Sequence, residues 1–264
     1  MNDAEPLLQL RGIGKNFGPV RALTDINFDI PAGQVTALVG DNGAGKSTLI
    51  KTVAGIWEPN GGEIIWQGKR VHFHTPKDAT HAGIATVYQD LALCDNLDIV
   101  QNMMLGHEVL KSGLLDEIDM EKEAKKTLAD LRVTTVHNIR QPVGSLSGGQ
   151  RQSVAVAKAV MLEAKLVIMD EPTAALGVKQ TALILELIER LASRGIAVLV
   201  ISHNLVDVFQ VADRIAVLFL GRLVTQGPKS DFTTDSAVHW ITTGTGPAAS
   251  GGASQAAGPL TTEA

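Results

Sequence analysis

The chain has 264 residues, of which 45% are hydrophobic, a mean hydropathy of +0.13 and a net charge of −5. This length is enough for one large domain with a buried core. The acidic balance argues against a nucleic-acid-binding protein, which usually presents a basic face. The apolar runs are far shorter than the roughly 20 residues that cross a membrane, and no charged-then-apolar leader opens the chain. We therefore expect a protein that is neither secreted nor membrane-inserted by its own sequence.

The first third of the chain predicts short strands separated by turns. The expected strands lie at residues 6–11, 20–30, 34–39, 63–67 and 84–88. Residues 31–33 (PAG) form a turn, and a helix is expected at 46–54, directly after a glycine-rich loop.

The middle of the chain, about 90–163, has no strand signal. Residues 117–132 carry apolar side chains at helical spacing, and 151–163 is an apolar helix. This change of pattern predicts an inserted helical subdomain. Further along, strands at 165–170, 196–201 and 214–219 alternate with helices at 178–192 and 204–210. That alternation is typical of a parallel α/β sheet.

We therefore expect one domain over residues 1–243, with the helical subdomain inserted at about 90–163. Residues 244–264 contain five glycines, six alanines and no aromatic residue. Such a segment buries too little apolar surface to offset its chain entropy, so a disordered tail is predicted.

The glycine-rich loop at residues 40–47, GDNGAGKS, matches the P-loop pattern G-x-x-x-x-G-K-[ST]. Its backbone N–H groups and the following helix N-terminus would cradle phosphates, while Lys46 reaches the β- and γ-phosphates. The alternative is a glycine-rich surface turn, which the flanking strand and helix disfavour. The residues expected to contact the nucleotide are Gly40, Asn42, Gly43, Ala44, Gly45, Lys46, Ser47 and Thr48.

A P-loop needs a neighbouring carboxylate that holds a metal ion. Asp170 ends an apolar strand and Glu171 follows at once, at the edge where open α/β sheets bind ligands. Asp170 and the Ser47 hydroxyl are therefore candidate Mg²⁺ ligands, and Glu171 is the candidate base that polarises the attacking water. His203, just beyond the next strand, is a candidate γ-phosphate contact. The alternatives are a solvent-facing acidic pair and a structural histidine.

Residues 146–150 read LSGGQ and precede an apolar helix. A serine and two glycines at a helix N-terminus form a second anion-binding device. Because the P-loop already holds the β- and γ-phosphates, this second motif has no phosphate to bind in a single copy of the chain.

With these motifs in this order, residues 5–240 resemble the nucleotide-binding subunits of ABC transporters. The resemblance implies a P-loop NTPase (RecA-like) α/β core with an N-terminal antiparallel β subdomain and an inserted α-helical subdomain. It also implies a homodimer paired head to tail, with each ATP between the P-loop of one subunit and the signature, residues 146–150, of the other. Ser147, Gly149 and Gln150 would then contact ATP in trans.

The resemblance assigns further residues. Phe17 matches the aromatic residue that stacks on adenine, with a core phenylalanine as the alternative. Gln89 matches the glutamine that senses the γ-phosphate and the membrane partner, and it joins Ser47 and Asp170 around Mg²⁺. His203 matches the switch histidine. Gly177 departs from the family, which usually has an aspartate there that couples the two sites across the dimer.

Finer likeness points to the importers of ribose, xylose, galactose and fructose. The similar segments are residues 41–49 (DNGAGKSTL), 81–90 (HAGIATVYQD), 168–176 (IMDEPTAAL) and 201–205 (ISHNL). The single P-loop and signature are similar to single-cassette, fructose-type members. An ATPase that uses ATP and Mg²⁺ is implied, lying peripherally on the cytoplasmic face of the membrane. Its implied partners are permease subunits and, indirectly, a periplasmic or lipid-anchored sugar-binding protein.

Two alternatives stay open: an ABC ATPase for another solute, and a soluble ABC ATPase outside transport. Neither a sustained heptad nor a cysteine cluster favours a repair ATPase, and there is no second cassette as in translation factors. The lone Cys94 predicts a semi-buried apolar role. His72 and His74 share a strand face without an evident third ligand, so a solvated face is favoured over a metal site.

In the family, the permease docks beside Gln89 and the helical insertion. Apolar residues in this part of the chain would line the docking cleft, or else belong to the core of the subdomain. These residues are Leu91, Leu93, Leu97, Met103 and Met104.

Overall fold

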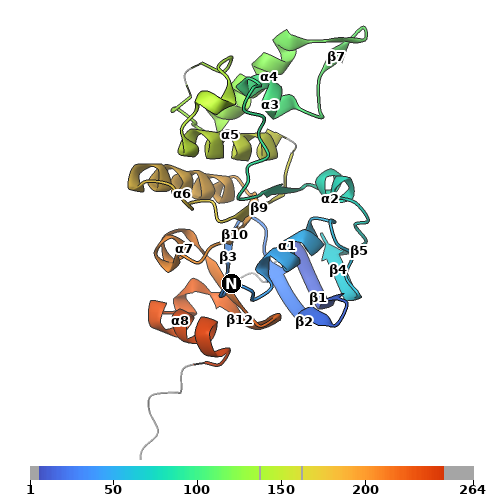
Figure 1. Ribbon diagram of the computed structural model, residues 1–264, viewed down its shortest axis with the longest axis vertical. Helices are drawn as coiled ribbons and strands as arrows, with labels where there is room; N and C mark the ends of the chain where they lie inside the picture. The colour runs from blue at the N-terminus through green and yellow to red at the C-terminus, as the bar shows by residue number, and fades with distance from the viewer. Residues whose placement is uncertain (1–5, 137, 162, 247–264) are drawn as a thin grey trace, which may run out of the picture.

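The computed structural model describes residues 6–136, 138–161 and 163–246. A six-stranded sheet runs through its centre in the order β12-β11-β3-β10-β9-β6 (Figure 1). Five strands are parallel, and β12 lies antiparallel to β11 at one edge. The strands are β3 (Val35–Val39), β6 (Ile84–Val87), β9 (Leu166–Asp170), β10 (Ala197–Ile201), β11 (Arg214–Phe219) and β12 (Arg222–Pro228).

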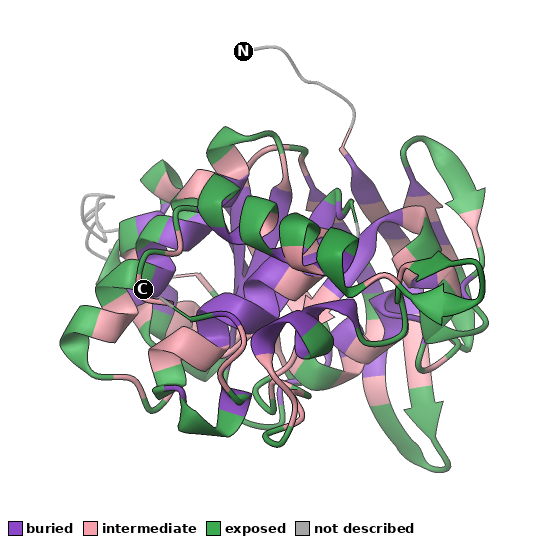
Figure 2. Cartoon of the chain, turned by 90° about the horizontal axis from the view of Figure 1, so that it is seen from above, coloured by how far each residue is buried: buried purple, intermediate pink, exposed green. Residues whose placement is uncertain are grey.

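The central strands are mostly apolar because both faces of the sheet are covered. In β9, Leu166 and Ile168 pack on one side, while Val167 and Met169 pack on the other. Side chains alternate between faces along a strand, so one short apolar run supplies two cores. Figure 2 shows these buried segments through the middle of the molecule.

A second, antiparallel sheet of order β2-β1-β4-β5 lies beside the first. Its strands are β1 (Leu8–Phe17), β2 (Val20–Ile30), β4 (Gly61–Trp66) and β5 (Lys69–Val71). Helix α1 (Lys46–Val53) lies between the two sheets, and its buried side chains Leu49, Ile50 and Val53 join both in one core. The helix that follows the P-loop is therefore held from two sides.

Helices cover the other face and the far edge of the main sheet (Figure 1). These are α5 (Gly148–Met161), α6 (Val178–Ser193), α7 (Leu205–Val211) and α8 (Thr234–Thr243), and α2 (Pro76–Ala82) precedes β6. Among the described residues, no helix is both long and apolar enough to cross a membrane.

Between β6 and β9 the chain forms a mainly helical region, which stands apart at the top of Figure 1. It contains α3 (Ile99–Met104), α4 (Glu117–Asp130) and α5. The expectation of no strands here was wrong in one place, because β7 (Leu110–Lys111) pairs with β8 (Leu114–Leu115) in a small hairpin.

The five apolar residues considered for permease docking differ in how deeply they are buried. Met103 and Met104 are buried in the core of the helical region, so of the two alternatives left open for them the core position is the one observed. Leu91 and Leu93 are partly buried against the same core, and Leu97 is also half-buried.

Most predicted elements lie within a few residues of the observed ones, but no range was predicted for β5, α2, α3, β12 or α8. Gly244 ends α8 with a left-handed backbone conformation, the usual helix-terminating geometry for glycine. The rest of the predicted tail, from residue 247 on, lies outside the described residues.

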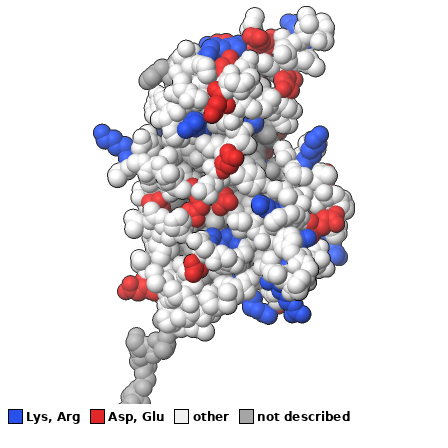
Figure 3. Space-filling view, in the orientation of Figure 1, with Lys and Arg blue, Asp and Glu red and all other residues white. Residues whose placement is uncertain are grey.

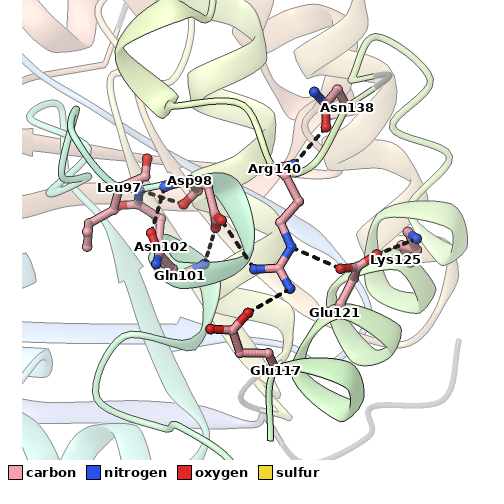
Figure 4. Close-up of polar contacts among 9 residues, drawn as sticks. All are labelled: Leu97, Asp98, Gln101, Asn102, Glu117, Glu121, Lys125, Asn138 and Arg140. Carbon is pink, nitrogen blue, oxygen red and sulfur yellow. Dashed lines mark hydrogen bonds and ion pairs between the residues drawn. The ribbon is translucent and has the colours of Figure 1, made fainter. Parts of the chain in front are cut away.

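A single arginine ties the helical region together (Figure 4). The guanidinium of Arg140 lies between three carboxylates: 2.9 Å from Glu121 and 3.4 Å from Glu117 on α4, and 3.3 Å from Asp98. Asp98 is also the N-cap of α3. The hydrogen bond to Glu121 is the largest cause of the raised pKa of Arg140. Arg140 therefore joins α3 and α4 to the segment that leads into the signature.

We expect Arg140→Ala to lower the free energy of unfolding by about 1 kcal/mol, since its ion pairs are partly exposed and screened by solvent. The thermal midpoint should fall by about 2–4 °C in a chain of this size. Arg70→Ala is the matched control, because Arg70 makes one exposed ion pair of 3.1 Å with Glu63. Equal losses in the two variants, measured by thermal denaturation, would contradict a special role for the Arg140 cluster.

Charged side chains of both signs are interspersed over the face drawn in Figure 3. Basic residues gather at its lower right, over the antiparallel sheet, and acidic residues lie mainly across the middle and top. This face therefore carries no extended field of one sign.

Candidate functional site

The P-loop connects β3 to α1 through a turn that leaves no room for side chains at two glycines. A Cβ added to Gly40 would lie 2.3 Å from the carbonyl oxygen of Leu218. Gly45 has φ +106°, and a Cβ there would lie 2.8 Å from the carbonyl oxygen of Ala22. A residue with a Cβ would not fit at either position, and the left-handed φ of Gly45 also favours glycine. This explains why the loop has glycines at these two places before Lys46.

Lys46 opens α1 and folds back over the loop. Its Nζ donates to the carbonyl oxygens of Gly40, at 2.8 Å, and Asp41, at 3.0 Å. Burial lowers the pKa of the Lys46 ammonium, and the nearby carboxylates of Glu171 and Asp170 oppose this shift. The cation is therefore held at the centre of the P-loop.

Asp170 ends β9, and its carboxyl is half-buried close to the P-loop. Burial first, and then repulsion from Glu171, raises the pKa of Asp170, while Lys46 and Lys51 oppose the shift. Two adjacent carboxylates thus share one strand end with a lysine, which is where a cation or a phosphate group would be bound.

Glu171 adopts φ +51°, a left-handed conformation that is uncommon outside glycine and often found at functional sites. Its N–H donates to Ile201 at 2.9 Å. The Glu171 Oε1 lies 2.8 Å from Nδ1 of His203, which follows β10. The side chain of His203 is 71% exposed and that of Glu171 only 15%. The backbone of this turn therefore points a shielded carboxylate at an accessible imidazole.

These groups share one cleft of about 680 Å³. Its predicted members are Asn42, Gly43, Gly45, Lys46, Ser47, Thr48, Gln89, Asp170, Glu171 and His203. They come from the carboxyl ends of β3, β6, β9 and β10, the edge at which parallel sheets bind ligands. Gly40 and Ala44 are buried beneath the loop and do not line the cleft.

Phe17, a predicted adenine contact, also lies outside the cleft lining. It is 40% exposed, so it is not a core residue. Its ring meets Trp57 edge-on, with centroids 4.7 Å apart, and Lys15 Nζ lies 5.3 Å from its centre. An accessible aromatic ring with a preset orientation suits stacking, and the adenine contact stays a prediction.

Six residues line the cleft without having been predicted: Val20, Arg21, Ala22, Ala174, Leu220 and Gly221. Most come from the start of β2 and from the turn between β11 and β12, which meet beside the P-loop. Thr24 N–H donates to Gly221 at 2.8 Å, and Gly221 N–H donates to Ala44 at 2.9 Å. No local motif marks these positions, because only the packing of the two sheets brings them to the site.

The signature lies outside this cleft. Ser147, Gly149 and Gln150 line a separate cavity of about 250 Å³ with Lys179 and Gln180 of α6. Ser147 N–H donates to the Gln150 side chain at 2.9 Å, and Gln150 Nε2 donates to Thr135 at 2.5 Å. The N-terminus of α5 therefore lines a cavity of its own, and the P-loop of the same chain does not line that cavity.

The histidine pair lies just past the end of β5 rather than within a strand. His72 and His74 are exposed, with ring centroids 6.4 Å apart. His74 Nδ1 lies 2.5 Å from Glu58 Oε1. Their predicted exposure to solvent is confirmed, but their predicted place on a strand is wrong.

Comparison with known proteins gives the family. The model for ABC transporters matches residues 23–174, more than half of the chain. The fructose import ATP-binding protein FrcA of Rhizobium meliloti is 48% identical, over 90% of this chain and 94% of its own length. The xylose/arabinose import ATP-binding protein XylG of Sulfolobus acidocaldarius is 44% identical, over 89% and 94%. The ribose import ATP-binding protein RbsA 1 of Agrobacterium fabrum is 41% identical, but the chain spans only 46% of it.

Solved structures agree with the sequence relatives. An ATP-binding cassette of an ABC transporter superposes with a TM-score of 0.80 at 26% identity, covering 90% of this chain and 97% of that one. A nucleotide-free cassette gives 0.74, also at 26% identity, with 84% and 91% covered. By fold, motif order and sequence identity, the chain belongs to the ABC transporter family.

Proposed function

We propose that this chain binds and hydrolyses ATP to energise the import of a monosaccharide. The observation that carries the first part is the cleft, in which a P-loop lysine, two adjacent carboxylates and a histidine face one space of about 680 Å³. Such a combination of phosphate-binding backbone, cation and water-orienting carboxylate is the equipment of phosphoryl transfer.

The oxygen donors in the cleft suit a magnesium ion. Mg²⁺ prefers carboxylate, hydroxyl and carbonyl oxygens, and Asp170, Ser47 and the Gln89 amide all line the same space. These three residues would hold the ion, which would neutralise charge on the β- and γ-phosphates. Lys46 and the backbone N–H groups of the P-loop would bind the same phosphates.

Glu171 would orient the attacking water and accept its proton as water attacks the γ-phosphorus and the bond to the leaving ADP breaks. Its bond to His203 holds the carboxylate at the cleft wall. The exposed His203 would contact the γ-phosphate and respond to its presence.

Two copies of the chain would form the working unit. The signature and the P-loop line different cavities, so each half-site is incomplete within one chain. A head-to-tail pair would bring the open N-terminus of α5 in one copy to the phosphates held by the other, with Ser147, Gly149 and Gln150 acting in trans. Helix N-termini favour such anions.

The proposal that the transported solute is a sugar rests on the relatives of this chain. Those named above are import proteins for fructose, xylose/arabinose and ribose, at 41–48% identity. By this likeness the chain would work at the cytoplasmic face of the membrane with permease subunits and, through them, a periplasmic or lipid-anchored sugar-binding protein. The half-buried Leu91, Leu93 and Leu97, next to Gln89, are the proposed permease contacts.

Reconstitution tests the import role. The chain should be assembled in liposomes with permease subunits and a sugar-binding protein chosen from those that neighbouring genes encode. ATP hydrolysis that one monosaccharide stimulates, together with accumulation of that sugar, is the expected result. Stimulation by a different class of solute, or by no solute, would contradict the sugar assignment and leave ATP hydrolysis standing.

Removal of magnesium gives a separate test of the metal site. We expect EDTA to stop hydrolysis and added Mg²⁺ to restore it. Asp170→Asn should raise the Mg²⁺ concentration needed for half-maximal rate, by about tenfold for each 1.4 kcal/mol of lost metal binding. An unchanged Mg²⁺ requirement in a steady-state ATPase assay would exclude Asp170 as a ligand.

A further inference from the structure

The signature turn packs directly on the start of α6 in the same chain. A Cβ added to Gly149 would lie 2.9 Å from both Cβ and Cγ of Gln180. A Cβ on Gly148 would lie 3.2 Å from Leu176. The two signature glycines therefore let the backbone of α5 rest against the side chains of residues 176 and 180.

The far end of the same Gln180 side chain reaches Gly177. This glycine is the N-cap of α6, and a Cβ there would lie only 2.6 Å from Gln180 Oε1. Gln180 stands three residues into the helix, where a glutamine commonly turns back toward the N-cap. The space that a side chain at position 177 would need is therefore filled by Gln180.

This contact connects parts of the chain that serve different ATP sites. Residues 172–177 lead directly from Glu171, and Ala174 of this loop lines the cleft. Thr173 Oγ1 also donates to the buried Asp207 at 2.7 Å, which ties the loop to α7. Gly149 belongs to the signature, whose proposed ligand is held by the other copy. Gln180 touches both the loop and the signature.

We infer that Gln180 is a positioning residue that couples the two ATP sites of the paired protein. Its stem presses on Gly149 and its amide lies over Gly177, so a shift of the loop at one cleft moves the signature of the opposite one. Packed contacts transmit such shifts when the elements on both sides are rigid helices and turns. The inference rests on the proposed ATP hydrolysis by a head-to-tail pair.

Steady-state ATP hydrolysis by the full chain tests this coupling. The wild type should show a Hill coefficient approaching 2, about the number of sites, and Gln180→Ala should bring it to about 1 with little change in ATP affinity. Gln180→Met should retain cooperativity, because methionine has a similar length and fills the same space. Glu189→Ala, an exposed change on the same helix, is the matched control. Loss of packing alone would lower stability or rate without moving the Hill coefficient.

A second variant guards against simple misfolding. Gly177→Ser would displace the Gln180 amide, since a Cβ at position 177 would lie 2.6 Å from Gln180 Oε1, and it would give α6 a better N-cap. Its Hill coefficient should therefore fall without a loss of thermal stability. Wild-type cooperativity in Gln180→Ala or Gly177→Ser, or its loss in Gln180→Met, would overturn the inference. So would a wild-type Hill coefficient of 1 in an active enzyme, which leaves the proposed function intact. Absence of any ATP hydrolysis in the wild type would instead overturn the proposed function.

Discussion

Glu171→Gln should bind ATP normally, hydrolyse it about 10²–10⁴-fold more slowly, and accumulate as a nucleotide-bound dimer. The glutamine keeps the shape of the side chain but cannot accept a proton from water, and general-base catalysis contributes factors of this size. The substitution also removes the negative charge that helps to raise the pKa of Asp170. Ionised Asp170 is then favoured, which strengthens rather than weakens the binding of Mg²⁺ and ATP.

Single-turnover hydrolysis and size-exclusion chromatography with ATP measure the two effects together. Glu189→Gln is the matched control, because it makes the same chemical change at an exposed position on α6. We expect this control to hydrolyse ATP at the wild-type rate and to elute without a stable dimer. Normal turnover in Glu171→Gln would remove Glu171 from the proposed mechanism. Slow turnover without dimer accumulation would instead contradict the sandwiched ATP.

The parallel part of the fold could be predicted because its signals are local and strong. The apolar runs of β3, β9 and β10 are each bounded by turns, and each ends at a polar residue or glycine. Because parallel strands put their carboxyl ends at one edge, their order along the chain was enough to place Lys46, Asp170 and His203 together.

The elements that were missed have weak or interrupted patterns. The prediction ended the first strand at residue 11, but β1 continues to Phe17 through register shifts after Leu10 and Ile13, which interrupt the two-residue alternation. The β7–β8 hairpin is exposed along its length and therefore shows no alternation to detect. For α2 a usable signal existed, since Thr75 and Asp78 form a capping box around Pro76.

The site was predictable as a set of groups but not as an arrangement. Sequence spacing cannot show that Glu171 turns toward His203, because this depends on one left-handed residue and on its bond to the neighbouring strand. It also cannot show that Gln180 fills the space beside Gly177. The predicted need for a partner could be read from the sequence, because the signature is a second phosphate-binding device for which the chain itself has no phosphate.

Two inactive variants of this chain should restore ATP hydrolysis when they are mixed. Lys46→Ala damages the P-loop half of the site. Ser147→Asp damages the signature half by placing a negative charge where the partner's phosphates would lie, yet aspartate still caps the N-terminus of α5. Each variant alone forms dimers in which both composite sites are defective. A mixed dimer contains one site made of two intact halves.

Random exchange makes half of the dimers mixed, so independent sites would give about one quarter of the wild-type activity. Mixing Lys46→Ala with the double variant is the control, because no intact P-loop remains in any dimer and activity should stay absent. If turnover requires both sites, the mixed dimer should still retain one ATP, which filter binding detects. A site built within one chain would gain nothing from mixing by either measure, because each chain would keep its own defect. Recovery therefore depends on the separation of the signature cavity from the P-loop cleft, the feature of this structure that makes a second copy necessary.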